Sequence, residues 1–145
     1  MTDWKTNIFA THEEQQPLAR NRPWPGEWFP GVALPCKEAL ERWVMIRFGS
    51  LYTCAIVWDV GPWCTDDSAY VLGIARPRAE QLKGQRCPRT LADPDSVATV
   101  PDGKGGNKTV FLSNSAGIDL FPFTARRLGI GIGENVNVDW RFVDL

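Results

Sequence analysis

The sequence lacks an excess of charge of either sign. Its 145 residues include 16 basic and 17 acidic side chains, which gives a formal net charge of -1. A protein that binds nucleic acid through its phosphates needs a positive field, because much of the affinity comes from displaced counterions. We therefore expect no nucleic-acid partner.

Long hydrophobic runs are also missing. No stretch approaches the roughly 18 apolar residues that a membrane span needs, and the first segment, Met1–Arg20, is polar. We expect neither a membrane span nor a signal peptide. Three explanations stay open: the protein stays in the cytoplasm, a leader has been removed, or it leaves the cell by another route such as lysis or a phage particle. Periplasmic or extracellular action is the interpretation that we favour.

Zinc-site spacing is missing too. The four cysteines are Cys36, Cys54, Cys64 and Cys87, and no two of them show the spacing of a zinc site. We therefore expect no metal. In an oxidising compartment two disulfides can form, with three possible pairings, and free buried thiols are the alternative. The pairing that we favour is Cys36 with Cys54.

Nucleotide-binding motifs are missing as well. Residues 102–108 (DGKGGNK) are rich in glycine but lack the Gly-Lys-Ser/Thr ending of a phosphate loop. Residues 129–134 (GIGIGE) lack the strand-to-helix context of a dinucleotide site. We expect no cofactor.

Apolar and aromatic residues are plentiful. The chain is 43% hydrophobic and its length suits one core, so we expect one domain and a monomer. It contains seven Trp residues. Trp fills cores and also stacks against the faces of sugars, and core packing is the more common role.

Proline and strand-forming residues divide the first half of the chain. Four prolines in residues 1–30 predict an extended arm that packs on the domain. Residues 42–59 hold two runs of strand formers separated by Gly49 and Ser50, which predicts a hairpin. Residues 65–114 have no sustained periodicity and predict a long inserted loop.

The second half ends in regular elements. Residues 117–120 predict a short strand, and Pro122 is placed at the first turn of a short helix that ends near Leu128. Residues 135–143 alternate apolar and polar side chains, as a half-buried strand does. The sum is a mainly β chain, for which a small closed barrel is the simplest solution.

Two segments carry a family resemblance: IVWDVGPW (residues 56–63) and AGIDLFPFTARRLGI (residues 116–130). In this order, and followed by a last strand, they resemble the double-psi β-barrel of rare lipoprotein A, the expansins, the barrel endoglucanases and the barrel-type lytic transglycosylases. The resemblance implies a six-stranded double-psi barrel over residues 31–145, with one or two short helices. It departs from rare lipoprotein A at Val60 and in residues 31–33.

The resemblance implies that Asp119 and Asp59 are the functional carboxylates. Cleavage of a glycosidic bond needs a proton for the leaving oxygen, which a carboxyl group beside apolar surface can donate. Asp119 is the expected acid/base, and Asp59 is a base in a hydrolase or an assistant in a lytic transglycosylase. Alternatively, Asp59 caps the Gly61–Pro62 turn and Asp119 caps the following helix.

Four further residues are candidates for substrate binding. Trp63 and Tyr70 follow Asp59 and have rings for stacking on sugar, although packing is an alternative for both. Asn114 precedes the Asp119 motif, where turns also favour asparagine. Arg76 can bind a carboxylate of peptidoglycan or pair with a neighbouring acid, and the second interpretation is favoured.

The leading functional hypothesis is a domain that acts on cell-wall polysaccharide, with peptidoglycan favoured over cellulose. It would cleave as a lytic transglycosylase or a glycoside hydrolase. The alternative is a non-catalytic, expansin-like module that binds glycan or loosens the wall. A third hypothesis is a structural domain of a larger assembly such as a phage particle.

Overall fold

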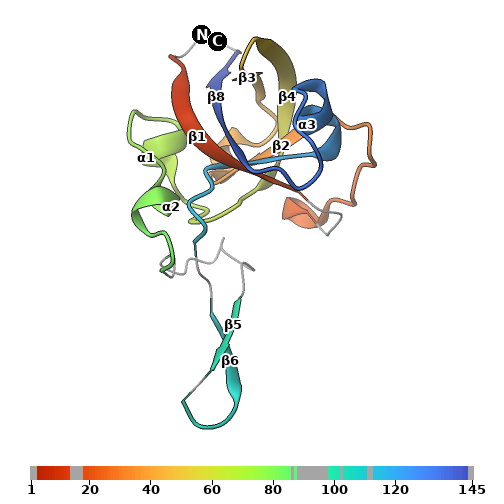
Figure 1. The fold of residues 1–145 in the computed structure, drawn as a ribbon. Helices are drawn as coiled ribbons and strands as arrows, with labels where there is room; N and C mark the ends of the chain where they lie inside the picture. Colours follow the sequence, from red (N-terminus) through yellow and green to blue (C-terminus); the bar gives the residue numbers. More distant parts are fainter. Residues whose placement is uncertain are drawn as a thin grey trace.

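Six strands close into a barrel in the computed structural model, which describes residues 3–13, 18–85, 87, 98–101, 103–110 and 113–143. The barrel strands are β1 (Lys5–His12), β2 (Gly31–Leu34), β3 (Trp43–Phe48), β4 (Leu51–Val60), β7 (Ile118–Leu120) and β8 (Val136–Phe142). Around the ring their order is β1-β7-β2-β4-β3-β8, and parallel and antiparallel pairs are mixed (Figure 1). The chain is therefore mainly β, with a closed barrel as its body.

The six strands form two sets of three that lie side by side around the ring, β2-β4-β3 and β8-β1-β7. In the first set β2 is followed by a 3₁₀ turn (Lys37–Ala39) and β3, and in the second β7 is followed by helix α3 (Pro122–Arg127) and β8. Strand β4 lies between β2 and β3, parallel to the former. Strand β1 lies in the same way between β7 and β8, parallel to β7. The first set is continuous in the chain from β2 to β4, whereas the second is completed by β1 from the N-terminal segment.

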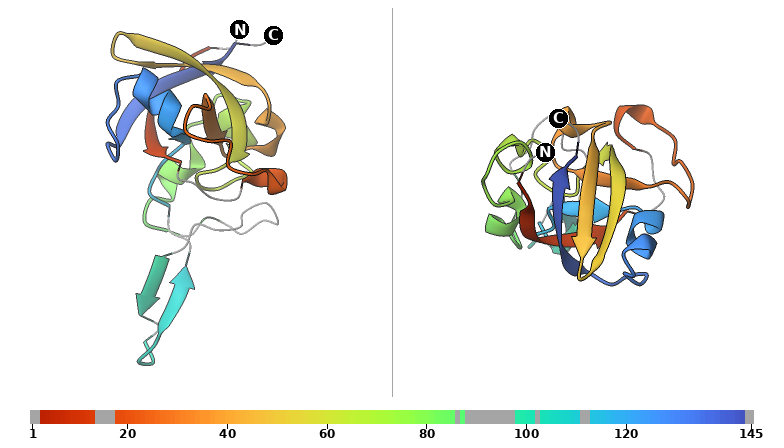
Figure 2. Two further views of the ribbon diagram at one scale, coloured as in Figure 1. Left: turned by 90° about the vertical axis from the view of Figure 1, so that its right-hand side faces the viewer. Right: turned by 90° about the horizontal axis from the view of Figure 1, so that it is seen from above.

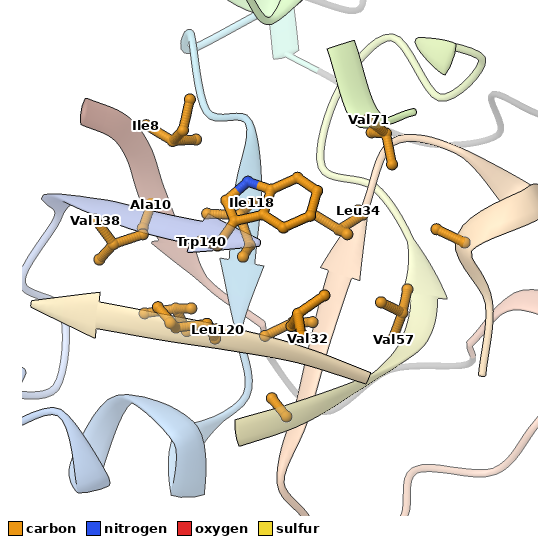
Figure 3. Packing of buried hydrophobic residues seen from close by; sticks show 14 of the residues in the cluster. Ile8, Ala10, Val32, Leu34, Val57, Val71, Ile118, Leu120, Val138 and Trp140 are labelled. Carbon is orange, nitrogen blue, oxygen red and sulfur yellow. The ribbon is translucent and has the colours of Figure 1, made fainter. Parts of the chain in front are cut away.

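Alternating side chains fill the barrel. In β8, the side chains of Val138, Trp140 and Phe142 point inward, and Trp140 lies centrally among residues of the other strands such as Ile118 and Leu34 (Figure 3). A large indole in a core needs a partner for its N–H group. The partner of Trp140 is a hydroxyl from outside the barrel strands, described with the candidate site below.

Several sequence-based expectations are confirmed. The predicted hairpin is β3 and β4, which pair antiparallel from Trp43↔Ile56 to Phe48↔Leu51. The predicted helix is α3, which begins with Pro122 in its first turn, and the predicted last strand is β8. The expected short strand is β7.

The N-terminal segment differs from the expectation for residues 1–30. Residues Lys5–His12 form β1, a full member of the barrel, and only the later part is an extended arm, with a 3₁₀ turn at Ala19–Asn21. The prolines that predict an arm begin at Pro17, so they place no constraint on the preceding residues. Ile8 and Ala10 alternate into the core, as strand residues do.

The segment 65–114 also contains regular structure. It includes helices α1 (Ser68–Val71) and α2 (Arg78–Gln81) beside the barrel, and a two-stranded ribbon of β5 (Ala98–Pro101) and β6 (Asn107–Val110). The ribbon projects away from the barrel (Figures 1 and 2). No helix in the described residues is long and apolar enough to cross a membrane.

The disulfide differs from the pairing that we favoured. Cys64 and Cys87 are bonded, with a Cα to Cα distance of 5.1 Å, whereas Cys36 is a free, buried thiol and Cys54 a free, exposed one. The prediction of Cys36 with Cys54 was therefore wrong. These two cysteines cannot pair because Cys36 points into the barrel core and Cys54 points outward from β4, so that they lie on opposite sides of the barrel wall.

Candidate functional site

Asp59 and Asp119 lie on the same outer face of the barrel. Strand β2 runs between β4 and β7, and its residue Ala33 is the register partner of both aspartates. Val32 and Leu34 point into the core, so Ala33 points outward. Paired residues of neighbouring strands point to the same side of a sheet, and the two aspartates therefore also point outward.

A bulge at Trp58 gives Asp59 this direction. Val57 pairs with Val32, but the next pair is Asp59 with Ala33, so Trp58 is one extra residue in β4. Such a bulge redirects the side chains that follow it. Without it Trp58 would pair with Ala33, and Asp59 would point into the apolar core.

The N-terminal segment adds a third carboxyl group, Glu13. Its backbone N–H group donates to the carbonyl oxygen of Leu120 at 2.9 Å, and its side chain is buried. The side chain is hydrogen-bonded to both Asp59 and Asp119. Two ionised carboxylates have no proton to donate, so each of these hydrogen bonds requires a proton. The three carboxyl groups, Glu13, Asp59 and Asp119, thus lie together, and we call them the carboxyl cluster.

Asp59 also fastens the arm to the barrel. The backbone N–H group of Ala19 donates to its Oδ1 atom at 2.8 Å, and the guanidinium group of Arg22 stacks at 4.0 Å from the centre of the Trp58 ring. Burial raises the pKa of Asp59, and hydrogen bonds from Ala19 and Val60 and the charge of Arg22 oppose that rise. The net result is a carboxyl group that is more basic than an ordinary aspartate.

Asp119 has the properties of a proton donor near neutral pH. Burial raises its pKa to about 6, and the charge of Asp59 adds to this effect. Hydrogen bonds from Thr11 and Glu13 and the charge of His12 act in the opposite direction. General acid/base groups work best when their pKa lies near the working pH. Asp119 is therefore suited to both donating and accepting a proton.

Asp119 does not have the capping role considered as an alternative. The N-cap residue of α3 is Phe121, and no side chain makes a cap hydrogen bond there. The aspartate that caps a helix is Asp67, which accepts from the N–H group of Tyr70 at the start of α1. Asp59 accepts from Ala19 of the arm, as described above.

A polar cleft of about 590 Å³ opens on the same side of β1. Its lining includes Phe9 and four asparagines, Asn7, Asn114, Asn135 and Asn137. Phe9 lies two residues before Thr11 on the outer face of β1, roughly 7 Å along the strand. Phe9 therefore shares a face of β1 with Thr11, which donates to Asp119, but the lining of the cleft includes neither Thr11 nor Asp119.

The structure brings Asn114 into this cleft and places the other predicted binding residues elsewhere. Tyr70 is fully buried, donates to the carbonyl oxygen of Gly117 at 3.0 Å and accepts from the Trp140 indole at 2.7 Å, so no face of its ring is open to a sugar. Trp63 is half-buried and packs against the cluster around the disulfide. Arg76 is hydrogen-bonded to two backbone carbonyls of β1 and pairs with Glu80.

Three residues of the site escaped sequence analysis: Thr11, His12 and Glu13. They surround Asp119, although more than a hundred residues separate them from it in the sequence. The pattern that could have identified them is the alternation of apolar residues at Ile8 and Ala10, because it predicts a strand that ends at these polar residues.

No protein-family model matches the chain, and no curated protein matches it either. Among the described residues, no group of three or more His, Cys, Asp or Glu side chains has an arrangement that could hold a metal ion. The function is therefore argued from the site itself.

Proposed function

We propose that this chain is a double-psi β-barrel domain that acts on cell-wall polysaccharide, on peptidoglycan in preference to cellulose, with Asp119 as its acid/base. The observation that carries the proposal is the carboxyl group of Asp119, whose pKa is raised to about 6 beside a second aspartate. The closed barrel contains one parallel pair in each set of three strands, β1 with β7 and β2 with β4, and this supports the double-psi assignment. The polar cleft, which the carboxyl cluster does not line, offers amide groups to sugar hydroxyls.

In the proposed reaction, protonated Asp119 donates its proton to the glycosidic oxygen as the bond from carbon to that oxygen breaks. In hydrolysis, water adds to the sugar carbon and loses a proton to Asp59. In lytic transglycosylation, a hydroxyl group of the same sugar attacks instead, and its proton returns to Asp119. Asp59 and Asp119 lie two strand spacings apart, roughly 10 Å between backbones, and a reactant between them would take the place of the Glu13 side chain.

A second candidate function is an expansin-like module that binds glycan without cleaving it. The observation in its favour is that Glu13 is hydrogen-bonded to both aspartates and so occupies the space between them. Cleavage requires a sugar to displace the Glu13 side chain, whereas binding in the polar cleft does not. Both functions use the same face of the barrel.

The test is mass spectrometry of the soluble products after incubation with purified peptidoglycan and, separately, with cellulose. Native protein is compared with Asp119→Asn, which keeps the shape of the side chain, and with Asp3→Asn as an exposed control. Anhydro-sugar or reducing-end fragments that disappear only with Asp119→Asn support the enzyme. If neither substrate yields fragments but the protein binds to the insoluble glycan, the non-catalytic module is supported.

A further inference from the structure

A second cavity, an aromatic groove, lies on the outer face of the hairpin of β3 and β4. It has a volume of about 610 Å³ and is closed on one side by α3. Its walls include Trp28, Trp43 and Tyr52, whose exposed fractions are 73%, 43% and 56%. Large aromatic side chains are rarely left this exposed without a binding role when several of them adjoin. None of the residues of the carboxyl cluster lines this groove.

The backbone fixes the aromatic rings along one line. Trp43 and Tyr52 point outward from the paired strands, because each is exposed and is followed by a buried residue. Arg47, the register partner of Tyr52, is four positions after Trp43, so the backbone positions of Trp43 and Tyr52 lie roughly 13 Å apart along the hairpin. This is longer than a single sugar ring, so a ligand that contacts both must be a chain.

Trp28 is held against helix α3. Its ring meets that of Phe123 edge to face, with centroids 5.9 Å apart, and the guanidinium group of Arg126 lies 4.9 Å from its centre. A ring held in this way loses little conformational entropy when it binds a ligand. The groove therefore presents pre-positioned apolar surfaces of the type that pack on the faces of sugars.

The charge along the groove is positive. Arg127 lines it, and Arg126 stands beside Trp28. Within the described part of the chain neither guanidinium group forms an ion pair, since the salt bridges there involve other arginines. A guanidinium group binds carboxylates through paired hydrogen bonds. The groove thus favours a ligand that carries both flat apolar faces and carboxylate groups.

We propose that the aromatic groove binds a polysaccharide chain that bears carboxylate groups, as a second binding surface separate from the carboxyl cluster. The choice of a polysaccharide as the ligand rests on the proposed function, whereas the place of the groove and its positive charge do not. The groove positions the insoluble polymer on the barrel independently of what happens at Asp119.

The experiment measures binding to insoluble peptidoglycan, which carries carboxylates, and to cellulose, which is neutral, by co-sedimentation at increasing protein concentration. The variants are Trp43→Ala, Tyr52→Ala and Arg127→Gln. The matched control is Leu51→Ala, because Leu51 is 47% exposed on the same hairpin but does not line the groove. Thermal unfolding of each variant checks that it is folded.

We expect Trp43→Ala and Tyr52→Ala each to weaken binding to peptidoglycan about tenfold, and Leu51→Ala to leave it unchanged. Arg127→Gln should weaken binding to peptidoglycan more than binding to cellulose, and added salt should abolish that difference. If Trp43→Ala and Tyr52→Ala are folded and bind peptidoglycan as tightly as the native protein does, the inference is overturned. A native protein that binds neither polymer would overturn it as well.

Product release, measured on the same samples, separates this inference from the proposed function. Fragments that depend on Asp119, together with unchanged binding by the groove variants, contradict the inference alone. Binding that depends on Trp43 and Tyr52, without any fragments, contradicts cleavage alone.

Discussion

Asp59 and Asp119 come from different strands but share one register partner, Ala33 of β2. This relationship makes their side chains point to the same face while keeping their backbones two strands apart. Glu13 closes the remaining space with hydrogen bonds to both carboxyl groups. The protonation of the two aspartates therefore depends on the position of the N-terminal segment, which carries Glu13.

The first prediction concerns the dependence of stability on pH. The pKa of Asp119 is about 6 in the folded protein and has a reference value of 3.8, so the folded state holds the proton more tightly. The stabilisation is complete below pH 4 and is lost as the pH rises through 6, which lowers the free energy of unfolding by on the order of 2–3 kcal/mol. The pKa of Asp59 is raised too, and changes stability in the same direction.

Urea unfolding of native protein and of Asp119→Asn between pH 4 and pH 8 measures this effect. In Asp119→Asn the free energy of unfolding should decrease much less over this pH range, because asparagine does not titrate. A native protein whose free energy of unfolding rises over this pH range would contradict the assigned pKa shift.

The second prediction concerns Glu13→Gln. An amide group always has protons to donate to Asp59 and Asp119 and carries no charge, so it favours their ionised forms. The pKa of Asp119 should therefore fall below its native value of about 6. Carbon-13 NMR of labelled aspartate carboxyl groups measures the change.

The control for this prediction is Glu27→Gln, a change at an exposed position on the arm. It should leave the titration of Asp119 as in the native protein. Equal titration curves for Glu13→Gln and native protein would show that Glu13 does not act on the aspartates in solution.

Local patterns in the sequence were enough to predict the hairpin, helix α3 and the last strand. Each is specified by neighbours in the chain: the Gly49–Ser50 turn, Pro122 in a first turn, and the alternation that ends at Phe142. The proximity of Asp59 to Asp119 is of another kind. It depends on β2 lying between two strands and on the bulge at Trp58, and no local pattern encodes either.

The same reason explains what sequence analysis missed. Glu13 and His12 reach Asp119 only because β1 is parallel to β7 in the closed barrel. Tyr70 follows Asp59 in sequence and so was a candidate for sugar binding, but its hydroxyl group satisfies Gly117 and Trp140 inside the fold. Sequence proximity to a motif indicates a shared site only when the chain between them does not turn into the core.

The third prediction tests that buried network. In Tyr70→Phe, the indole N–H group of Trp140 loses its acceptor and the carbonyl group of Gly117 loses its donor. Buried polar groups without partners cost roughly 1–3 kcal/mol of stability. Urea unfolding should show a loss of this size for Tyr70→Phe. Tyr52→Phe removes the hydroxyl group of the chain's other tyrosine, which is exposed, and should change stability by less than about 0.5 kcal/mol.

The fourth prediction concerns the thiols. Cys54 is exposed and Cys36 is buried, and burial together with a hydrogen bond to Glu38 raises the pKa of Cys36 to about 11. The thiolate is the reactive form, so an alkylating reagent at neutral pH should modify Cys54 quickly and Cys36 only after unfolding. Mass spectrometry should therefore count one modified residue in the folded oxidised protein, two after unfolding and four after unfolding with reduction. Peptide mapping should find Cys64 joined to Cys87. A peptide that joins Cys36 to Cys54 would contradict the barrel geometry, because those two side chains lie on opposite sides of its wall.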